Sequence, residues 1–460
     1  MARGAFLGCP RRRQTAAEND AGIAVKPFGW LVAVTIFVTF AAVPAWVPQE
    51  MRVGGISFQY YELLLLAAAA VALVQPTTVS VVKYIIPFIA VCVVTAGWSL
   101  VVAGANFGKM GSDVRWPFYT AVAMFVASKI VGTPNQTRCL QAVLATVWFS
   151  AIMVMLASTT GIELVGKSES ASLAVYGGDI ATRFLTPATF LAVVIAAVCI
   201  TCLISGNRLG FRVSVWLVPA AVLIMLSFSR NHLLGLAAAV LFALFAFRSA
   251  RSVVASVWAG SIVVLIGIAI QLGVANVFSA IPATDYIAAQ AHGYVERVIN
   301  GLKPDNQAID PSVQYRRKEN ATLSKKISES PVIGHGFGYA YKAPSGPAGD
   351  FFRETAPYYA HNFYLWLLLK AGWVGMVAFV WMAFVPLVRV VLKPVSTLQV
   401  ATASAAVGLL AISVFAPIPN DSPGAPLLGA VLGVAVALSG VRTAPKVQQQ
   451  TVARAEVVVP

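Results

Sequence analysis

Residues 331–338 read Pro-Val-Ile-Gly-His-Gly-Phe-Gly, residues 358–362 read Tyr-Tyr-Ala-His-Asn, and residues 363–388 form an apolar run. A polar segment carrying Arg316 therefore leads into a glycine-rich turn and a histidine, directly before a run long enough to span a membrane, which takes roughly 20 residues. This order predicts that an arginine-bearing helix, the turn and the histidine meet at the mouth of a membrane bundle.

The composition of the rest of the chain agrees with a membrane bundle. Of 460 residues, 58% are hydrophobic and only 11% are charged, which is typical of a polytopic membrane protein. Twelve runs qualify as spans: 28–47, 56–74, 84–105, 116–132, 139–161, 187–205, 213–229, 231–247, 253–273, 363–388, 397–416 and 426–441. The predicted fold is all-α, a polytopic membrane helix bundle of about twelve transmembrane helices with a large, partly helical extracytoplasmic loop.

The positions of lysine and arginine predict the orientation, because short cytoplasmic loops retain positive charge. With Arg11, Arg12 and Arg13 inside, the alternate loops that hold most other cations are also inside. This divides the chain into a cytoplasmic tail 1–27, nine helices over 28–273, an extracytoplasmic catalytic loop 274–361, three helices over 362–441 and a cytoplasmic tail 442–460. The net charge of +15 is then mainly a topology signal, with membrane lipid and not nucleic acid as the expected partner.

Two outward loops are long enough to be functional. Loop 162–186 contains Arg183, and the segment 274–361 is predicted to form helices over 284–300 and 313–330. On the second of these helices, the spacing of a single face is followed by Arg316, Asn320, Leu323 and Ile327. Pro331 is expected to end this helix.

The turn after Pro331 contains Gly334, Gly336 and Gly338. Glycine permits positive φ and a close approach of the backbone to a ligand, although a plain turn is the alternative. A dinucleotide site is excluded because no alternating strand and helix pattern surrounds the glycines.

Together these residues resemble the signature region of the O-antigen ligase and O-antigen polymerase superfamily. The resemblance covers roughly 180–390 and is carried by Arg316, Pro331-x-x-Gly-x-Gly-x-Gly338, His361-Asn362-x-Tyr364-Leu365, Gly372-x-x-Gly375, Ser227-x-Ser-Arg230 and Arg183. One departure is Asn320, which stands where many members carry an aromatic residue.

The resemblance implies a membrane glycosyltransferase of surface polysaccharide biosynthesis in the bacterial cytoplasmic (inner or plasma) membrane. The donor is expected to be a polyprenyl-diphosphate-linked glycan such as an undecaprenyl diphosphate derivative, and the acceptor a hydroxyl of a glycan or glycolipid. Transfer is expected at the outer face, with inversion and with neither metal nor cofactor. A ligase and a chain-extending polymerase differ only in the acceptor, and both stay open.

Three arginines are candidates for holding the donor diphosphate. The planar guanidinium forks of Arg183, Arg230 and Arg316 match phosphate oxygens. The alternative is an arginine that anchors a helix end at the membrane surface. A functional role is favoured for Arg230, since it lies between two apolar spans with almost no loop to solvate it, and similarly for Arg316. By contrast, Arg317 and Lys318 are expected to face solvent.

His361 is the candidate base for the acceptor proton, because histidine is the side chain whose ordinary pKa lies near neutrality. An interfacial histidine bonded to a backbone carbonyl is the alternative. His335 and the glycines of the turn, with Asn362 and Tyr364 of the signature, are expected to bind substrate. His232 is interpreted as a helix cap and His292 as a solvated loop residue.

Other classes of function fit less well. Metal catalysis calls for paired carboxylates, yet the first outer loop offers only Glu50. A lipid-linked glycan flippase or transporter would bury ionisable residues at mid-membrane and break helices in paired positions. The middle of the spans looks almost free of charge, with Glu62 the nearest exception. A scaffold would leave Arg230 unexplained.

Overall fold

The computed structural model describes residues 17–53, 56–75, 80–101, 105–169, 182–206, 213–249, 303–347 and 349–440, with single positions between 254 and 301. The expected ninth span, the expected helix 284–300, His292 and both ends of the chain lie wholly or almost wholly outside these residues.

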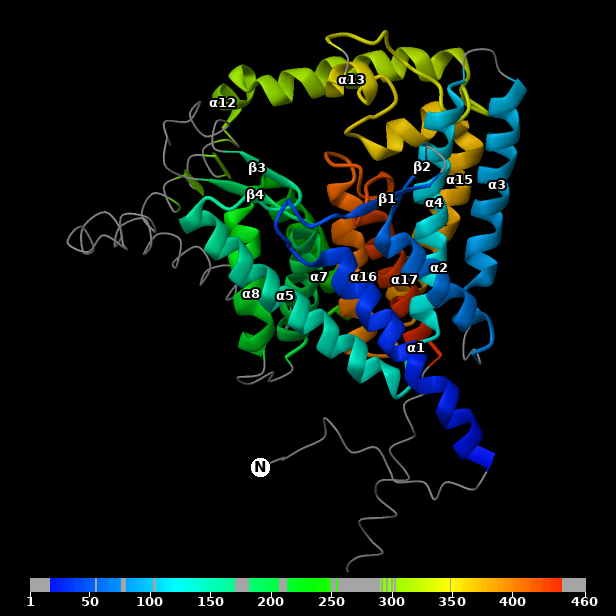
Figure 1. The fold of residues 1–460 in the computed structure, drawn as a ribbon, viewed down its shortest axis with the longest axis vertical. Helices are drawn as coiled ribbons and strands as arrows, with labels where there is room; N and C mark the ends of the chain where they lie inside the picture. Colours follow the sequence, from blue (N-terminus) through cyan, green and yellow to red (C-terminus); the bar gives the residue numbers. More distant parts are fainter. Residues whose placement is uncertain are drawn as a thin grey trace, which may run out of the picture.

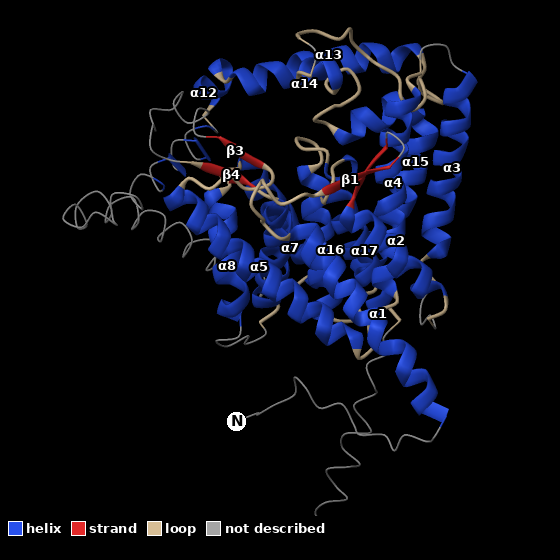
Figure 2. Ribbon diagram, viewed as in Figure 1, coloured by secondary structure: helices blue, strands red, loops and turns tan. Residues whose placement is uncertain are grey.

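The described residues form a helix bundle that confirms the predicted all-α class (Figures 1 and 2). Eleven of the twelve expected spans coincide with helices: α1 (Ala17–Phe40), α2 (Tyr60–Leu73), α3 (Val82–Val101), α4 (Phe107–Ser128), α5 (Asn135–Thr160), α7 (Pro187–Ile204), α8 (Ser214–Leu226), α9 (Arg230–Phe247), α15 (Phe363–Leu392), α16 (Thr397–Ile412) and α17 (Gly424–Leu438). Five of them, α3, α5, α7, α9 and α15, are long and apolar enough to cross a membrane alone.

Small residues let the central helices approach closely, as the Gly- and Ala-rich spans predict. A Cβ added at Gly429 or Gly433 of α17 would lie 2.0 and 2.3 Å from carbonyl oxygens of Thr120 and Met124 in α4. The α9–α16 crossing is similar, since a Cβ at Gly408 would lie 2.9 Å from a carbonyl oxygen of α9.

Two short antiparallel hairpins lie near one end of the bundle: β1 (Glu50–Val53) with β2 (Ile56–Gln59), and β3 (Lys167–Glu169) with β4 (Arg183–Leu185). The second hairpin carries Arg183 on β4, paired with Glu169 in the register.

The same end of the bundle is crossed by residues 303–361, which we call the lid (Figure 1). It contains α12 (Pro304–Ile309), α13 (Pro311–Glu329) and α14 (Phe351–Glu354). Asp310 caps α13 by accepting a hydrogen bond from the Ser312 amide, and the helix ends one residue before Ser330-Pro331, as predicted. Leu323 on the predicted inward face is fully buried, whereas Arg317 and Lys318 are exposed.

Candidate active site beneath the lid

The glycine-rich turn, residues 331–338, is joined to a break in α15, and we call this segment the strap. Gly372 has φ 61° and ψ −162°, so α15 is two helical pieces. The break leaves backbone groups unpaired within the helix, and the strap pairs with them. The amides of His335 and Gly336 donate to the carbonyls of Leu369 and Lys370 at 2.8 and 2.9 Å. In return, the amides of Trp373 and Val374 donate to the carbonyls of Pro331 and Val332.

The glycines of the strap have the positive φ that the sequence predicts: 70° at Gly334, 88° at Gly336 and 78° at Gly338. Each also lies against its own protein. Added Cβ atoms would lie 2.5 Å from the Lys370 carbonyl, 2.7 Å from a hydroxyl in α3 and 2.5 Å from a carbonyl before α4, respectively. These contacts explain the glycines by packing, and their role in substrate binding stays a prediction.

A buried ion pair fastens the strap to the bundle. The fully buried Lys370 ammonium donates to Asp113 Oδ2 of α4 at 2.6 Å and to the Tyr339 carbonyl at 2.9 Å. Asp113 Oδ2 also accepts the Gly338 amide at 2.8 Å. We call these contacts the latch. The expectation that the spans are almost free of charge missed Lys370, while the predicted exception Glu62 is fully buried and lies 3.0 Å from Arg115.

His361 lies at the start of α15 and is held by a carboxylate of the lid. Glu319 Oε2 accepts the His361 backbone amide at 2.9 Å and lies 3.0 Å from Nδ1 of its ring. The hydroxyl of Tyr341 donates to the other Glu319 oxygen at 3.1 Å. The Glu319 side chain is 1% exposed and that of His361 is 25% exposed. No sequence motif singled out Glu319, although it lies three residues after Arg316 and hence on the same helix face.

Arg230 and Arg183 are fixed near the sharp turn between α8 and α9. Phe228 in that turn has φ 44°, an uncommon conformation that concentrates at functional sites. Arg230 donates to the Gly301 carbonyl at 2.5 Å and to Asp310 Oδ2 at 2.6 Å. Arg183 donates from Nε to the Ser227 carbonyl at 3.0 Å.

Arg316 and Asn320 are one turn apart on α13 and carry buried polar atoms. Neither Arg316 Nε nor Asn320 Oδ1 has a hydrogen-bond partner among the described residues. Burial lowers the pKa of Arg316, and Arg230 adds to this, whereas Tyr359, Asp310 and Glu319 oppose it. Two of the predicted arginines and the carboxylate that holds His361 are therefore close enough to interact electrostatically.

The remaining predicted residues have partners within the protein. Asn362 caps α15 by accepting the amides of Tyr364 and Leu365, and the Tyr364 hydroxyl donates to the Leu410 carbonyl at 2.8 Å. His335 Nε2 lies 2.8 Å from the Lys326 carbonyl, and the ring stacks on Tyr339 with centroids 4.3 Å apart.

His232 is buried in α9, next to Arg230. Its Nδ1 lies 2.9 Å from the hydroxyl of Ser227, the residue that caps the C-terminus of α8. The contact therefore joins the two helices that the turn connects.

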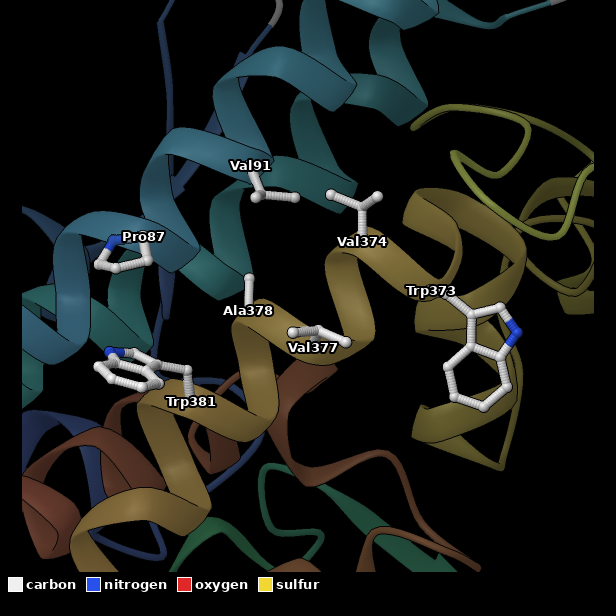
Figure 3. A pocket seen from close by; sticks show the side chains of 7 residues that line it. All are labelled: Pro87, Val91, Trp373, Val374, Val377, Ala378 and Trp381. Carbon is white, nitrogen blue, oxygen red and sulfur yellow. The ribbon is translucent and has the colours of Figure 1, made fainter.

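An apolar groove of about 520 Å³ lies between α3 and α15 (Figure 3). Seven side chains line it: Pro87, Val91, Trp373, Val374, Val377, Ala378 and Trp381. It offers no ionisable group, so we place the candidate reaction site beneath the lid. Among the residues described, there is no group of three or more His, Cys, Asp or Glu side chains arranged to hold a metal ion.

Comparison with curated proteins finds no significant match. Residues 213–380, which include α8, α9, the whole lid and the first part of α15, match the family described as O-antigen ligase. Over these residues the match confirms the resemblance that the sequence motifs carry from Ser227 to Gly375, whereas Arg183 lies outside the matched region.

Proposed function

We propose that this multi-pass membrane protein transfers a glycan from a polyprenyl-diphosphate carrier to an acceptor hydroxyl, as an O-antigen ligase-type enzyme. The family match supports the class of reaction and its place in surface polysaccharide biosynthesis. The observation that carries the proposal is the single inward face of α13. It presents the Arg316 guanidinium, whose buried Nε has no partner among the described residues, and, three residues on, the carboxylate that holds His361.

The donor diphosphate is assigned to Arg230 and Arg316, with Arg183 beside the same turn. As the bond between the anomeric carbon and the diphosphate oxygen breaks, that oxygen keeps the electron pair and gains negative charge. A guanidinium already positioned in a partly buried site stabilises this charge more than solvent would. Arg230 is bound to Asp310 in the structure, so donor binding exchanges this carboxylate for a phosphate oxygen.

The acceptor hydroxyl is assigned to His361, which is partly exposed and lies at the mouth of the bundle. The ring accepts the hydroxyl proton while the oxygen bonds to the anomeric carbon from the side opposite the diphosphate. This attack inverts the anomeric centre, and the proton passes later from the imidazolium to solvent. The mechanism requires neither metal nor cofactor.

The lid is assigned to the outer face of the membrane. Helix ends that carry Lys129, Arg248, Arg389 and Lys393 point away from the lid, because each of these residues ends a helix whose other end lies beside the lid. Positive charge is retained on the cytoplasmic side, so these cations support a lid that faces outward.

The test is transfer by the purified protein in lipid vesicles supplied with lipid-linked glycans and surface acceptors extracted from its own cells. His361→Ala is expected to abolish transfer, and Lys318→Ala, an exposed residue on α13, serves as the control. The size ladder of the product separates a polymerase from a ligase. Retention of full transfer by His361→Ala contradicts the assignment of the base.

A lipid-linked glycan transporter is the second candidate, and two observations favour it. The buried Lys370–Asp113 pair and the broken α15 are features expected of such a transporter. The strap, however, pairs with the backbone groups at the break and donates a hydrogen bond to Asp113. Neither feature is therefore open to a transported substrate, which favours the enzyme. Glycan that changes sides in the vesicles, with no covalent product, would replace the enzyme assignment by the transporter.

A further inference from the structure

We propose that Glu319 is a positioning residue that holds His361 in the Nδ1–H tautomer, so that Nε2 is the atom that receives the acceptor proton. This inference rests on the proposed function, because it assigns a role within the same reaction. Nothing in the family match or in the sequence motifs assigns this role to Glu319.

The hydrogen-bond geometry carries the inference. Glu319 Oε2 lies 3.0 Å from Nδ1 and also accepts the His361 backbone amide at 2.9 Å. An ionised carboxylate only accepts hydrogen bonds, so the ring nitrogen facing it carries the proton. A neutral imidazole has one N–H, which leaves the lone pair on Nε2. With the backbone amide on the same oxygen, both the tautomer and the ring direction are fixed.

The surroundings keep Glu319 ionised and the ring in place. Burial raises the pKa of Glu319, but hydrogen bonds from the ring and backbone amide of His361 and from Tyr341, with the charge that the ring carries when protonated, outweigh this and hold the pKa below its usual range. The other titratable groups that interact with the pair are Arg316 and the aromatic rings of Tyr315 and Tyr359. Those two rings meet the imidazole edge to face, with centroids 5.8 and 5.2 Å away.

A purely structural role, in which Glu319 docks α13 onto the start of α15, predicts different behaviour. Docking requires only an acceptor for the His361 amide, which the carbonyl of glutamine supplies in Glu319→Gln. The amide of glutamine, however, also donates hydrogen bonds, so it pairs with either tautomer and fixes neither. Because the wrong tautomer cannot take the proton at Nε2, we expect turnover in Glu319→Gln to fall about 100-fold or more. KM for the donor should change little.

The experiment combines turnover with ¹⁵N spectra of histidine-labelled full-length protein in lipid nanodiscs. The chain has only four histidines, and the His361→Gln spectrum identifies the His361 signals. In the wild type we expect a protonated Nδ1 and an unprotonated Nε2. Glu319→Gln should lose this pattern and its turnover together. Glu329→Gln, an exposed carboxylate on the same helix, should change neither.

Each outcome decides the inference. An unchanged His361 tautomer in Glu319→Gln overturns it, whether turnover is kept or lost through docking alone. If Glu319→Gln fails to fold, Glu319→Asp keeps the charge and should retain Nδ1–H with reduced turnover, and loss of that tautomer overturns the inference. Absence of transfer by the wild type sinks the proposed function instead, whereas an active wild type with an equally active Glu319→Gln sinks only the role of Glu319.

Discussion

Two groups of buried polar residues lie under the same lid and differ in how completely they are paired. In the latch, Lys370 has a carboxylate and a carbonyl, and Asp113 has an ammonium and an amide. The second group, which we call the arginine cluster, comprises Arg230, Arg316 and Asn320. In it, Nε of Arg316 and Oδ1 of Asn320 are buried without a hydrogen-bond partner in the described part of the chain. Buried polar groups are nearly always paired, so the exceptions ask for an explanation. The pairing within the latch indicates a structural role, whereas the unpaired atoms of the cluster are consistent with our proposal that it binds the donor diphosphate.

The largest effect is expected from breaking the latch. Lys370→Met leaves the Asp113 carboxylate buried beside a single amide, which should destabilise the fold by about 3 kcal/mol or more. Thermal unfolding in nanodiscs measures the change. The double variant Lys370→Met/Asp113→Asn should recover much of the loss, because a neutral amide still accepts from Gly338. Equal loss in the single and double variants would contradict the pairing.

Arg316 should give the opposite pattern, with a large loss of activity and little loss of stability. Arg316→Gln removes a guanidinium whose Nε has no described partner, and we expect turnover to fall about 100-fold, as for removal of one transition-state donor. The matched control is Arg317→Gln, the exposed neighbour, which should keep its turnover. If Arg316→Gln unfolds at as low a temperature as Lys370→Met, the arginine cluster contributes as much to stability as the latch, which contradicts the proposed difference between them.

Adding a single methyl group at the break of α15 should destabilise the docking of the strap. In Gly372→Ala the Cβ would lie 2.2 Å from the Val332 carbonyl oxygen, at φ 61°, so strain and a clash should cost about 1–3 kcal/mol. Gly97→Ala in α3 is the control, since its Cβ meets nothing within 4 Å. Thermal unfolding and proteolysis of the strap report the difference. Equal stability of the two variants would show that the strap moves aside.

Replacing Asn320 is expected to raise stability, whereas the other substitutions lower it or leave it unchanged. Replacing a buried polar atom that has no partner by an apolar group of similar size removes a desolvation penalty, so Asn320→Leu should raise stability by up to about 1 kcal/mol. Donor and acceptor KM values should show whether the amide also contacts substrate. A loss of stability in the unfolding curve would reveal a protein partner for Asn320.

The smallest effect on stability near neutral pH is expected from the Glu319 contact. Its folded-state pKa lies below the ordinary value, so its contribution to lid docking is present above the unfolded pKa of about 4.3 and is lost as pH falls through the folded value. The protection factors of the α13 amides, in which the pH dependence of intrinsic exchange is divided out, should thus stay constant from pH 7 to about 5 and fall only at lower pH. Glu319→Gln should remove this acid response.

The sequence predicts the features that depend on neighbouring residues. The apolar runs predict eleven helices of the bundle, Pro331 predicts the end of α13, and the glycine pattern predicts positive φ in the strap. Each follows from local chemistry, namely the length of an apolar run, the ring of proline and the missing Cβ of glycine.

Contacts between distant residues could not be predicted in this way. Lys370 and Asp113 are 257 residues apart, and their pairing depends on which helices are neighbours in the bundle. Glu319 belongs to a run of charged residues that reads as solvated, yet its spacing from Arg316 and Leu323 puts it on the inward face. That spacing is the signal that could have revealed it.

The latch can form only late in the synthesis of the protein, because its two charged residues are far apart in the chain. At about 5–20 residues per second, Lys370 follows Asp113 out of the ribosome after an interval on the order of tens of seconds. During that interval the Asp113 carboxylate lacks the lysine that neutralises it in the folded protein. The strap, made between the two, docks only when α15 arrives. The candidate active site is therefore completed late in synthesis, after most of the bundle is in the membrane.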